Sequence, residues 1–163
     1  MNATLARGVD ASVVLWRPLV DADIEAVVAL ERDAHAAPWT AGNFRDAMAA
    51  GYGVAVGAID GVIVAYGVLL FAPGEVQLLN LTVAPAARRR GVGRALLRRF
   101  LADAHARGAN QCFLEVRVSN EVAIALYASE GFVPVARRAA YYPAQAAALR
   151  EDALVMRRAL AGN

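Results

Sequence analysis

The chain has 163 residues, 58% of them hydrophobic, and a net charge of +2 from 17 basic and 15 acidic side chains. All of the basic side chains are Arg, because the sequence contains no Lys. The absence of Lys excludes Schiff-base chemistry, a lysine general base and the phosphate-binding loop that requires a Gly-Lys pair.

Cysteine, histidine and the N-terminal segment bear on where the protein works. The single Cys, Cys112, cannot form an internal disulfide, and the two widely separated His residues offer no zinc-ligand spacing. The uncharged run 61–74 is shorter than a membrane-spanning helix and contains Pro and Gly. Residues 1–12 are expected to form a flexible leader without the pattern of a signal peptide. We therefore expect a cytoplasmic protein without a metal, with one domain over residues 13–160.

The first part of that domain is predicted to contain one strand and two helices. Val13–Trp16 is rich in β-forming residues and is expected to stop at the following Pro. Asp21 is a candidate N-cap for a helix over residues 22–34, whose apolar residues recur on one face. Thr40 is a candidate N-cap for a second helix over residues 41–48.

The middle of the chain changes to the two-residue period of strands. Residues 52–59 and 62–71 are joined by Asp60-Gly61, a pair that favours a tight hairpin turn. A Pro-Gly pair then leads into a third strand, Glu75–Val83. Three consecutive strands joined by such short turns predict antiparallel pairing.

Helices and strands alternate in the second half. The predicted elements are a helix over 91–107, a strand over 111–118, a helix over 121–129 capped by Ser119-Asn120, and closing strands in 132–138 and 150–158. The Ala-rich stretch between the closing strands carries no signal. Antiparallel strands followed by a β-α-β crossover predict a single α+β domain with a mixed, mostly antiparallel sheet flanked by helices.

Arginine gathers at the start of the helix predicted over 91–107. Six of the 17 Arg lie between Arg88 and Arg99, around the sequence Gly91-Val-Gly93. Glycine at a strand-to-helix junction lets the backbone approach a ligand, and the first N–H groups and the dipole of a helix favour a phosphate or pyrophosphate. The residues alone leave two alternatives open, a solvated run of charge and a nucleic-acid surface, although no aromatic residue is interleaved with the Arg.

Several strings of sequence resemble the GNAT superfamily of N-acetyltransferases over residues 13–158. The strand–RRRGVG–helix segment is similar to the acetyl-CoA signature of that superfamily. The strings NLTVAPAARRRGVGRALL, LEVRVSNEVAIALYASEGF, RRAAYYP, REDALVM and HAAPW are similar to the RimI branch, bacterial enzymes that acetylate the N-terminus of a small-subunit ribosomal protein. The resemblance implies a GNAT-type domain with a β-α-β acetyl-CoA-binding core. It also implies an acetyl-CoA-dependent protein N-α-acetyltransferase whose acceptor is an N-terminal alanine.

The resemblance also implies which residues bind cofactor and substrate. Those expected to hold acetyl-CoA, at strands ending near residues 83 and 118, are Leu81, Thr82, Val83, Arg89, Arg90, Gly91, Val92, Gly93, Arg94 and Asn120. Those expected to contact the acceptor peptide are His35, Trp39, Tyr141 and Tyr142. The expected partner is therefore a protein N-terminus, and neither a membrane nor direct binding of nucleic acid is expected.

The reaction needs a base for the amine and an acid for the departing thiolate. By resemblance, Glu115 is the base and Tyr127 is the acid. From the residues alone, an acid in a strand can equally lie on the solvent face, and a helical Tyr can pack in the core. Cys112 is best interpreted as a small core residue.

Two rivals to this function remain. One is the same chemistry on a broader range of N-termini or on a small-molecule amine. The other belongs to a different class, a module that binds CoA or nucleic acid without catalysis.

Overall fold

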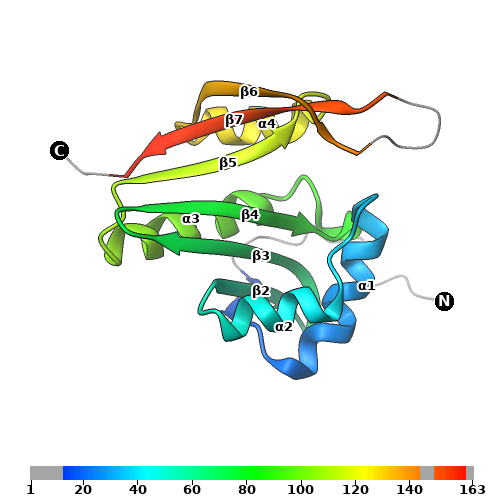
Figure 1. Ribbon diagram of the computed structural model, residues 1–163. Helices are drawn as coiled ribbons and strands as arrows, with labels where there is room; N and C mark the ends of the chain where they lie inside the picture. The colour runs from blue at the N-terminus through cyan, green and yellow to red at the C-terminus, as the bar shows by residue number, and fades with distance from the viewer. Residues whose placement is uncertain (1–12, 144–148, 161–163) are drawn as a thin grey trace. The chain divides into compact units, whose positions relative to one another are not determined.

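The structure is a computed structural model that describes residues 13–143 and 149–160. Its elements follow the predicted order of strands and helices (Figure 1). They are β1 (Leu15–Pro18), the 3-10 helix η2 (Asp21–Asp23), α1 (Ile24–Ala34), α2 (Ala41–Ala49), β2 (Gly53–Ile59), β3 (Val62–Ala72), β4 (Glu75–Val83), η3 (Pro85–Ala87), α3 (Val92–Ala106), β5 (Gln111–Arg117), α4 (Glu121–Ser129), β6 (Val133–Tyr142) and β7 (Glu151–Ala159). The leader predicted at residues 1–12 and residues 144–148 of the Ala-rich stretch lie outside the described residues.

The strands pair in the order β1-β2-β3-β4-β5-β7-β6. β4 and β5 are parallel, with a register that runs from Glu75↔Gln111 to Leu78↔Leu114, and the segment between them contains α3. β1 with β2, β5 with β7 and β6 with β7 are antiparallel. The predicted α+β fold with a mixed, mostly antiparallel sheet and a β-α-β unit is therefore confirmed.

Contacts divide the chain into two compact units, and β3, β4 and α3 each contribute residues to both. The first unit comprises residues up to 68 together with 80–99, and the second comprises 69–79 together with residues from 100 onwards. Large side chains that are fully buried include Val27, Phe44, Val56, Tyr66, Leu96 and Leu97 in the first unit, and Leu69, Leu114, Phe132 and Met156 in the second. Each unit therefore has apolar core residues of its own.

The hairpin between β2 and β3 follows from its turn residues. Asp60 and Gly61 have φ values of 50° and 79°, and a type I′ turn requires positive φ at both central positions. Gly has no Cβ to clash there, and Asp is one of the few other residues that tolerate this region. The turn thus fixes the strand boundaries where the sequence predicted them.

The predicted N-caps of α2 and α4 are confirmed. The Thr40 hydroxyl accepts the backbone N–H of Asn43 at 3.2 Å, and the Asn43 side chain accepts the Thr40 N–H at 2.9 Å. The Asn120 side chain accepts the backbone N–H of Ala123 at 3.2 Å. These bonds satisfy N–H groups that have no partner inside the helix.

The entry into α1 differs from the prediction. Asp21 makes no capping bond, because the chain passes through η2 before the α-helix begins and the Asp21 carboxylate accepts a bond from Arg45 at 2.8 Å. Asp23 instead accepts the backbone N–H of Val20 at 3.0 Å and two bonds from Arg17 at 2.6 and 2.8 Å. The hydrogen bonds from Arg17 hold the pKa of Asp23 below its usual value.

The first strand begins two residues later than predicted. β1 pairs with β2 from Leu15↔Ala58 to Pro18↔Ala55, so Pro18 is its last residue rather than a stop before it. An edge strand tolerates Pro because only one of its sides is hydrogen-bonded.

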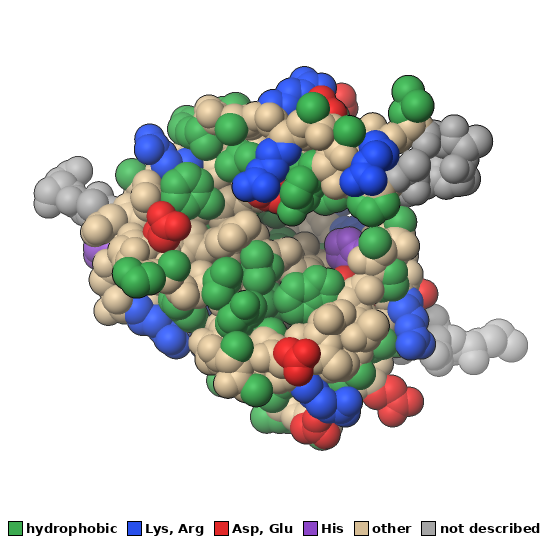
Figure 2. All heavy atoms as spheres, viewed as in Figure 1, with side chains coloured by type: hydrophobic (Ala, Val, Ile, Leu, Met, Phe, Trp, Pro, Cys, Tyr) green, Lys and Arg blue, Asp and Glu red, His purple; other side chains and the backbone are tan. Residues whose placement is uncertain are grey.

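No helix in the described parts of the chain is long and apolar enough to cross a membrane. On the face shown in Figure 2, basic side chains are interspersed with acidic ones rather than gathered in one patch.

Candidate functional site

Residues 88–91, the Arg-Gly turn, form a tight turn between η3 and α3 in the first unit. Arg89 and Gly91 both have positive φ, 61° and 77°, on either side of Arg90, which does not. Alternation of this kind points successive backbone N–H groups into one concavity, which suits an anion. Within the described residues, Arg90 Nη1 is a buried side-chain nitrogen without a hydrogen-bond partner. The turn therefore combines backbone donors with an unsatisfied cationic donor, as a phosphate site requires.

The start of α3 is positioned by its apolar face. Val92, Leu96 and Leu97 are buried, whereas Arg98 and Arg99 are exposed. This helix therefore has an apolar face toward the core and basic residues on its outer face. Burial of Val92 fixes the first turn of the helix, whose N–H groups belong to the predicted cofactor site.

A buried carboxylate that sequence reasoning missed lies in the same unit. The Glu31 side chain on α1 is 2% exposed. It accepts hydrogen bonds from the Tyr66 hydroxyl, from Asn80 Nδ2 at 2.9 Å and from the backbone N–H of Trp39 at 3.0 Å. The signal was present in the sequence, since Glu31 stands four residues after Val27 and therefore on the buried face of the helix.

This cluster brings together two residues that were predicted to have different roles. His35 Nε2 lies 2.8 Å from the Thr82 hydroxyl oxygen, so a candidate substrate residue contacts a candidate cofactor residue. Thr82 in turn donates to Asn80 Oδ1 at 2.7 Å. Trp39, the other candidate in this loop, packs its ring 5.2 Å from that of Phe44. The loop after α1 is thereby tied to the buried face of β4.

The part of β4 predicted to meet the cofactor alternates in burial. Thr82 is buried, while Leu81 and Val83 are half-buried on the other face of the strand. The Val83 carbonyl accepts a bond from Arg88 Nε at 3.0 Å. The Arg-Gly turn is therefore anchored to the end of the strand that precedes it.

Glu115 lies at the centre of the predicted chemistry in the second unit. Its neighbours Leu114 and Val116 are buried on the opposite face of β5, and its own side chain is 13% exposed. Arg138 Nε on β6 lies 3.0 Å from Glu115 Oε1, and the Tyr141 side chain hydrogen-bonds the same carboxylate. Glu115 is thus on the non-core face of its strand, but Arg138 and Tyr141 cover it.

The two tyrosines predicted to contact substrate lie beside Glu115. Tyr141 and Tyr142 have ring centroids 5.0 Å apart, and Arg117 lies 4.2 Å above the Tyr142 ring. The hydrogen bond to Glu115 raises the pKa of Tyr141, and burial, with the Glu115 charge second, raises the pKa of Tyr142 to about 12. Both hydroxyls are therefore protonated at neutral pH.

A bulge in β6 sets the position of Tyr141. The register with β7 shifts between Arg138 and Tyr142, and Ala140 in this interval has a φ of 49°. Asp152 on β7 accepts the Ala140 N–H at 2.7 Å and Arg137 Nε at 2.6 Å. The strained backbone is thus stabilised by a carboxylate of the neighbouring strand.

Tyr127 lies on the buried face of α4. Its ring packs against Phe132 in an edge-to-face arrangement, with 5.8 Å between the ring centroids. Tyr127 is therefore part of the core, which was the alternative that the residues alone left open. Burial raises its pKa to about 12, with Tyr142 and Cys112 as the next contributors. Asn120, predicted to contact the cofactor, is exposed at the cap of the same helix. Cys112 is buried and burial raises its pKa to about 12, which agrees with a core thiol.

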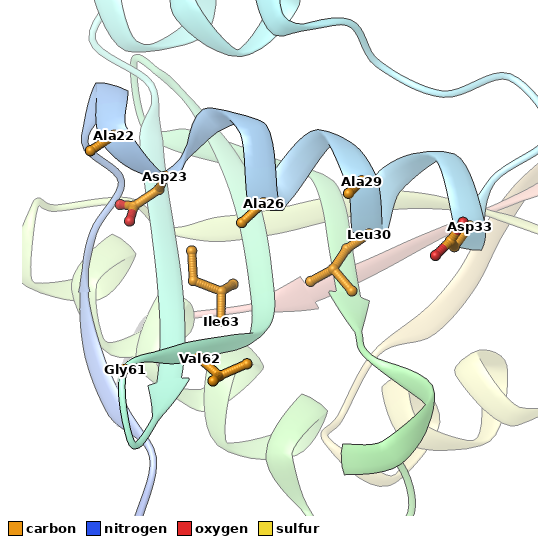
Figure 3. Close-up of a pocket in the computed structure, with 9 residues that line it drawn as sticks. All are labelled: Ala22, Asp23, Ala26, Ala29, Leu30, Asp33, Gly61, Val62 and Ile63. Atoms are coloured by element: carbon orange, nitrogen blue, oxygen red, sulfur yellow. The ribbon is translucent and has the colours of Figure 1, made fainter.

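A pocket of about 460 Å³ lies elsewhere in the first unit, between η2, α1 and the start of β3 (Figure 3). Its walls are mostly small or aliphatic side chains and include Ala26, Leu30 and Ile63. None of the candidate residues lines it. Among the described residues, no group of three or more His, Cys, Asp or Glu could hold a metal ion.

Comparison with known proteins identifies the family. The pattern of the acetyltransferase (GNAT) family matches residues 24–132. The chain belongs to this family. It is 37% identical over 134 residues to the [ribosomal protein bS18]-alanine N-acetyltransferase of Escherichia coli. The aligned region covers 82% of this chain and 89% of that protein. It is 39% identical over 126 residues to the N-alpha-acetyltransferase RimI of Mycobacterium tuberculosis, covering 74% and 75% of the two chains.

Solved structures agree with this assignment. The crystal structure of the ribosomal-protein-S18-alanine N-acetyltransferase from Escherichia coli has a TM-score of 0.84 and 33% identity, covering 92% of this chain and 96% of that one. Ard1 from Thermoplasma volcanium has a TM-score of 0.83 and 26% identity over 92% and 99%. The predicted GNAT fold and the resemblance to the RimI branch are therefore confirmed, and the chain is an acetyltransferase that uses acetyl-CoA.

The residues of the Arg-Gly turn fit this cofactor. The pyrophosphate of CoA is an anion, and the turn offers both the concavity of backbone donors and the buried Arg90 Nη1 that lacks a partner. A cofactor bound there would satisfy that nitrogen.

Proposed function

We propose that this chain transfers the acetyl group of acetyl-CoA to the α-amine of a protein N-terminus, most specifically the N-terminal alanine of a small-subunit ribosomal protein. The observation that carries the proposal is the similarity to the bS18-alanine N-acetyltransferase of Escherichia coli, which extends over 82% of this chain. A protein acceptor of this kind would place the reaction in the cytoplasm.

The chemistry of the acceptor supports an N-terminus over a lysine side chain. An α-amine has a pKa of about 7.7–8.0, so roughly a tenth of it is neutral at pH 7, whereas a lysine amine with a pKa of about 10.4 is far less available. The difference of about 2.5 pKa units corresponds to about 3.4 kcal/mol. A carboxylate base without further activation can deprotonate an α-ammonium group but is poorly matched to the ammonium group of lysine.

In this proposal, Glu115 removes a proton from the α-ammonium group, directly or through water. The neutral nitrogen attacks the thioester carbonyl that acetyl-CoA supplies, and the carbon–sulfur bond breaks as Tyr127 gives a proton to the departing thiolate. The second proton, which the nitrogen loses as the amide forms, returns to the Tyr127 oxygen directly or through water. Glu115 rests in an ion pair with Arg138 at 3.0 Å, and burial raises the pKa of Tyr127 to about 12, so that its hydroxyl carries a proton at neutral pH. Tyr141 and Tyr142 lie beside Glu115, which supports a role in contacting the acceptor.

Acetyl-CoA would be held by the backbone of Leu81–Val83, the turn and helix start from Arg89 to Arg94, and Asn120. The orphaned Arg90 nitrogen supports the pyrophosphate position. His35 and Trp39 would line the acceptor side of the first unit.

A panel of acceptors tests the proposed specificity. Rates of acetylation are compared for hexapeptides that begin with Ala, Met or Ser and for a peptide with a blocked N-terminus and a free Lys. We expect the Ala peptide to react fastest. A preference for the Lys peptide would overturn the N-terminal assignment, and equal rates on all three N-termini would favour the broader N-α-acetyltransferase instead. The enzyme itself contains no Lys, so the signal for acetylated lysine can come only from the peptide.

Glu115→Gln separates catalysis from mere binding of CoA. We expect turnover to fall while the affinity for acetyl-CoA is retained, since Glu115 lies in the second unit and outside the Arg-Gly turn. Undiminished acetylation by this variant would remove Glu115 from the mechanism. A wild-type protein that binds acetyl-CoA but acetylates no amine would favour the non-catalytic alternative.

A further inference from the structure

The buried carboxylate of Glu31 begins a chain of hydrogen bonds that ends on a half-exposed imidazole. The links run from Glu31 Oε2 to Asn80 Nδ2 at 2.9 Å, from Asn80 Oδ1 to the Thr82 hydroxyl at 2.7 Å, and from the Thr82 hydroxyl to His35 Nε2 at 2.8 Å. The two ends of this hydrogen-bond chain differ in exposure, which is 2% for the Glu31 side chain and 41% for that of His35. All four residues belong to the first unit.

The position of every proton in this chain follows from its first member. Both oxygens of a carboxylate accept, so Asn80 must turn its NH₂ group toward Glu31 and its carbonyl oxygen toward Thr82. A carbonyl oxygen has no proton, so the single proton of the Thr82 hydroxyl lies on that side. The Tyr66 hydroxyl also neighbours Thr82, but its own proton points to Glu31. The Thr82 oxygen can therefore only accept from His35.

His35 must then carry a hydrogen on Nε2. The second neighbour of this nitrogen agrees, because Glu31 Oε2 lies 3.6 Å from it and is also an acceptor. In a neutral imidazole only one ring nitrogen carries hydrogen, so Nδ1 of His35 has a free lone pair and is the ring's hydrogen-bond acceptor. The donor-to-acceptor direction of these hydrogen bonds thus fixes the tautomer of the His35 ring.

We propose that Nδ1 of His35 accepts a hydrogen bond from an N–H group of the acceptor polypeptide, and that Glu31 is the positioning residue that keeps it an acceptor. The proposal rests on the proposed function, because a peptide N-terminus is rich in N–H donors near the reacting amine. The anchoring of the same loop supports it, since Glu31 also holds the Trp39 backbone N–H at 3.0 Å. One buried carboxylate therefore sets both the position of the loop and the polarity of its exposed ring.

The first test determines the tautomer of His35 and does not depend on catalysis. The chain has two His residues, and the exposed His105 can be replaced by Gln so that the imidazole nitrogen NMR signals of His35 stand alone. Spectra at about pH 8, where an ordinary His is neutral, should show hydrogen on Nε2 and a bare Nδ1. Thr82→Val should remove this preference and Thr82→Ser should restore it. Hydrogen on Nδ1 in the wild-type ring would overturn the proposal.

The second test separates the contact with substrate from a structural role. A Gln side chain can reproduce the Nε2 position of His but has no acceptor at the Nδ1 position. His35→Gln should therefore keep the bond to Thr82 and the thermal stability, yet lower kcat/KM for the Ala peptide by about tenfold to one-hundredfold, with the affinity for acetyl-CoA unchanged. His105→Gln is the matched control and should leave every rate as it is. Wild-type kcat/KM in His35→Gln would refute the contact with the acceptor.

Failure of the proposed function can be distinguished from failure of the His35 contact. If wild-type protein acetylates no peptide, the second test has no signal to lose and the proposed function falls with the acceptor contact. The NMR result would then still decide whether the tautomer is fixed as inferred.

Discussion

Removal of the Glu31 carboxylate should be among the most damaging single changes to this fold. In Glu31→Ala three donors lose their acceptor, namely the Tyr66 hydroxyl, Asn80 Nδ2 and the Trp39 N–H. Tyr66 is fully buried and Asn80 is 9% exposed, so water replaces the lost bonds poorly. A buried donor without a partner costs about 1–3 kcal/mol, and the lost side-chain volume adds to this. We expect a loss of about 3–5 kcal/mol in the free energy of unfolding.

Urea unfolding followed by circular dichroism measures this loss. The matched control is Glu25→Ala, which removes an exposed acid from the same helix and should change stability by less than about 0.5 kcal/mol. Because a typical domain is stable by only about 5–15 kcal/mol, Glu31→Ala can fail to fold altogether. In that case Tyr66→Phe can be measured instead, since it removes only one donor and should lower the free energy of unfolding by about 1 kcal/mol. A loss below about 1 kcal/mol in a folded Glu31→Ala protein would refute the account of the cluster.

Three further predictions concern the proton donor, the cofactor turn and the entry into α1. Tyr127→Phe should lower kcat by about 10²–10⁴ with the affinity for acetyl-CoA retained, measured by steady-state kinetics and titration; an unchanged kcat would leave Tyr127 only its packing role. Arg90→Gln should weaken acetyl-CoA binding by about tenfold to one-hundredfold in calorimetry, whereas the exposed Arg99→Gln should not; equal effects would indicate a general charge effect instead of a specific contact. Arg17→Gln should lower the melting temperature at pH 7, because the lowered pKa of Asp23 stabilises the fold above the unfolded pKa of about 3.9 and this contribution disappears as pH falls through the folded pKa. A difference that persists unchanged at about pH 2 would contradict that origin.

Local signals in the sequence were enough to predict the order of the elements. Asp60-Gly61 specifies a turn with two positive φ values, and Thr40 and Asn120 cap helices with their own side chains. Each of these depends on residues that are close in the chain. Asp21 was misassigned as a cap because its partner, Arg45, stands 24 residues away and no local pattern indicates that contact.

The same distinction applies to the candidate site. The tight backbone turn at the start of α3 could be predicted because Gly91 and the neighbouring Arg are adjacent in the sequence, whereas its binding of an anion stays a prediction. The helical spacing after Val27 indicates that Glu31 is buried, but its partners could not be predicted, because they come from β3 and β4 and meet α1 only through the fold. The contact between Glu115 and Tyr141 likewise depends on a bulge in β6, where two alanines give no hint of the shift in register.

Glu31 and Glu115 differ in a way that supports the separate roles proposed for them. Glu31 accepts three hydrogen bonds and is 2% exposed, so any change in its protonation would disturb a buried network. Glu115 is also largely covered, but its charged partner Arg138 is 57% exposed, and an ion pair with so exposed a cation contributes little and breaks easily. A general base has to gain and lose a proton in every turnover, so it must be able to leave its resting partner. By that criterion Glu115 is suited to act on the amine, and Glu31 is suited to hold the loop and the ring that the amine's own chain would meet.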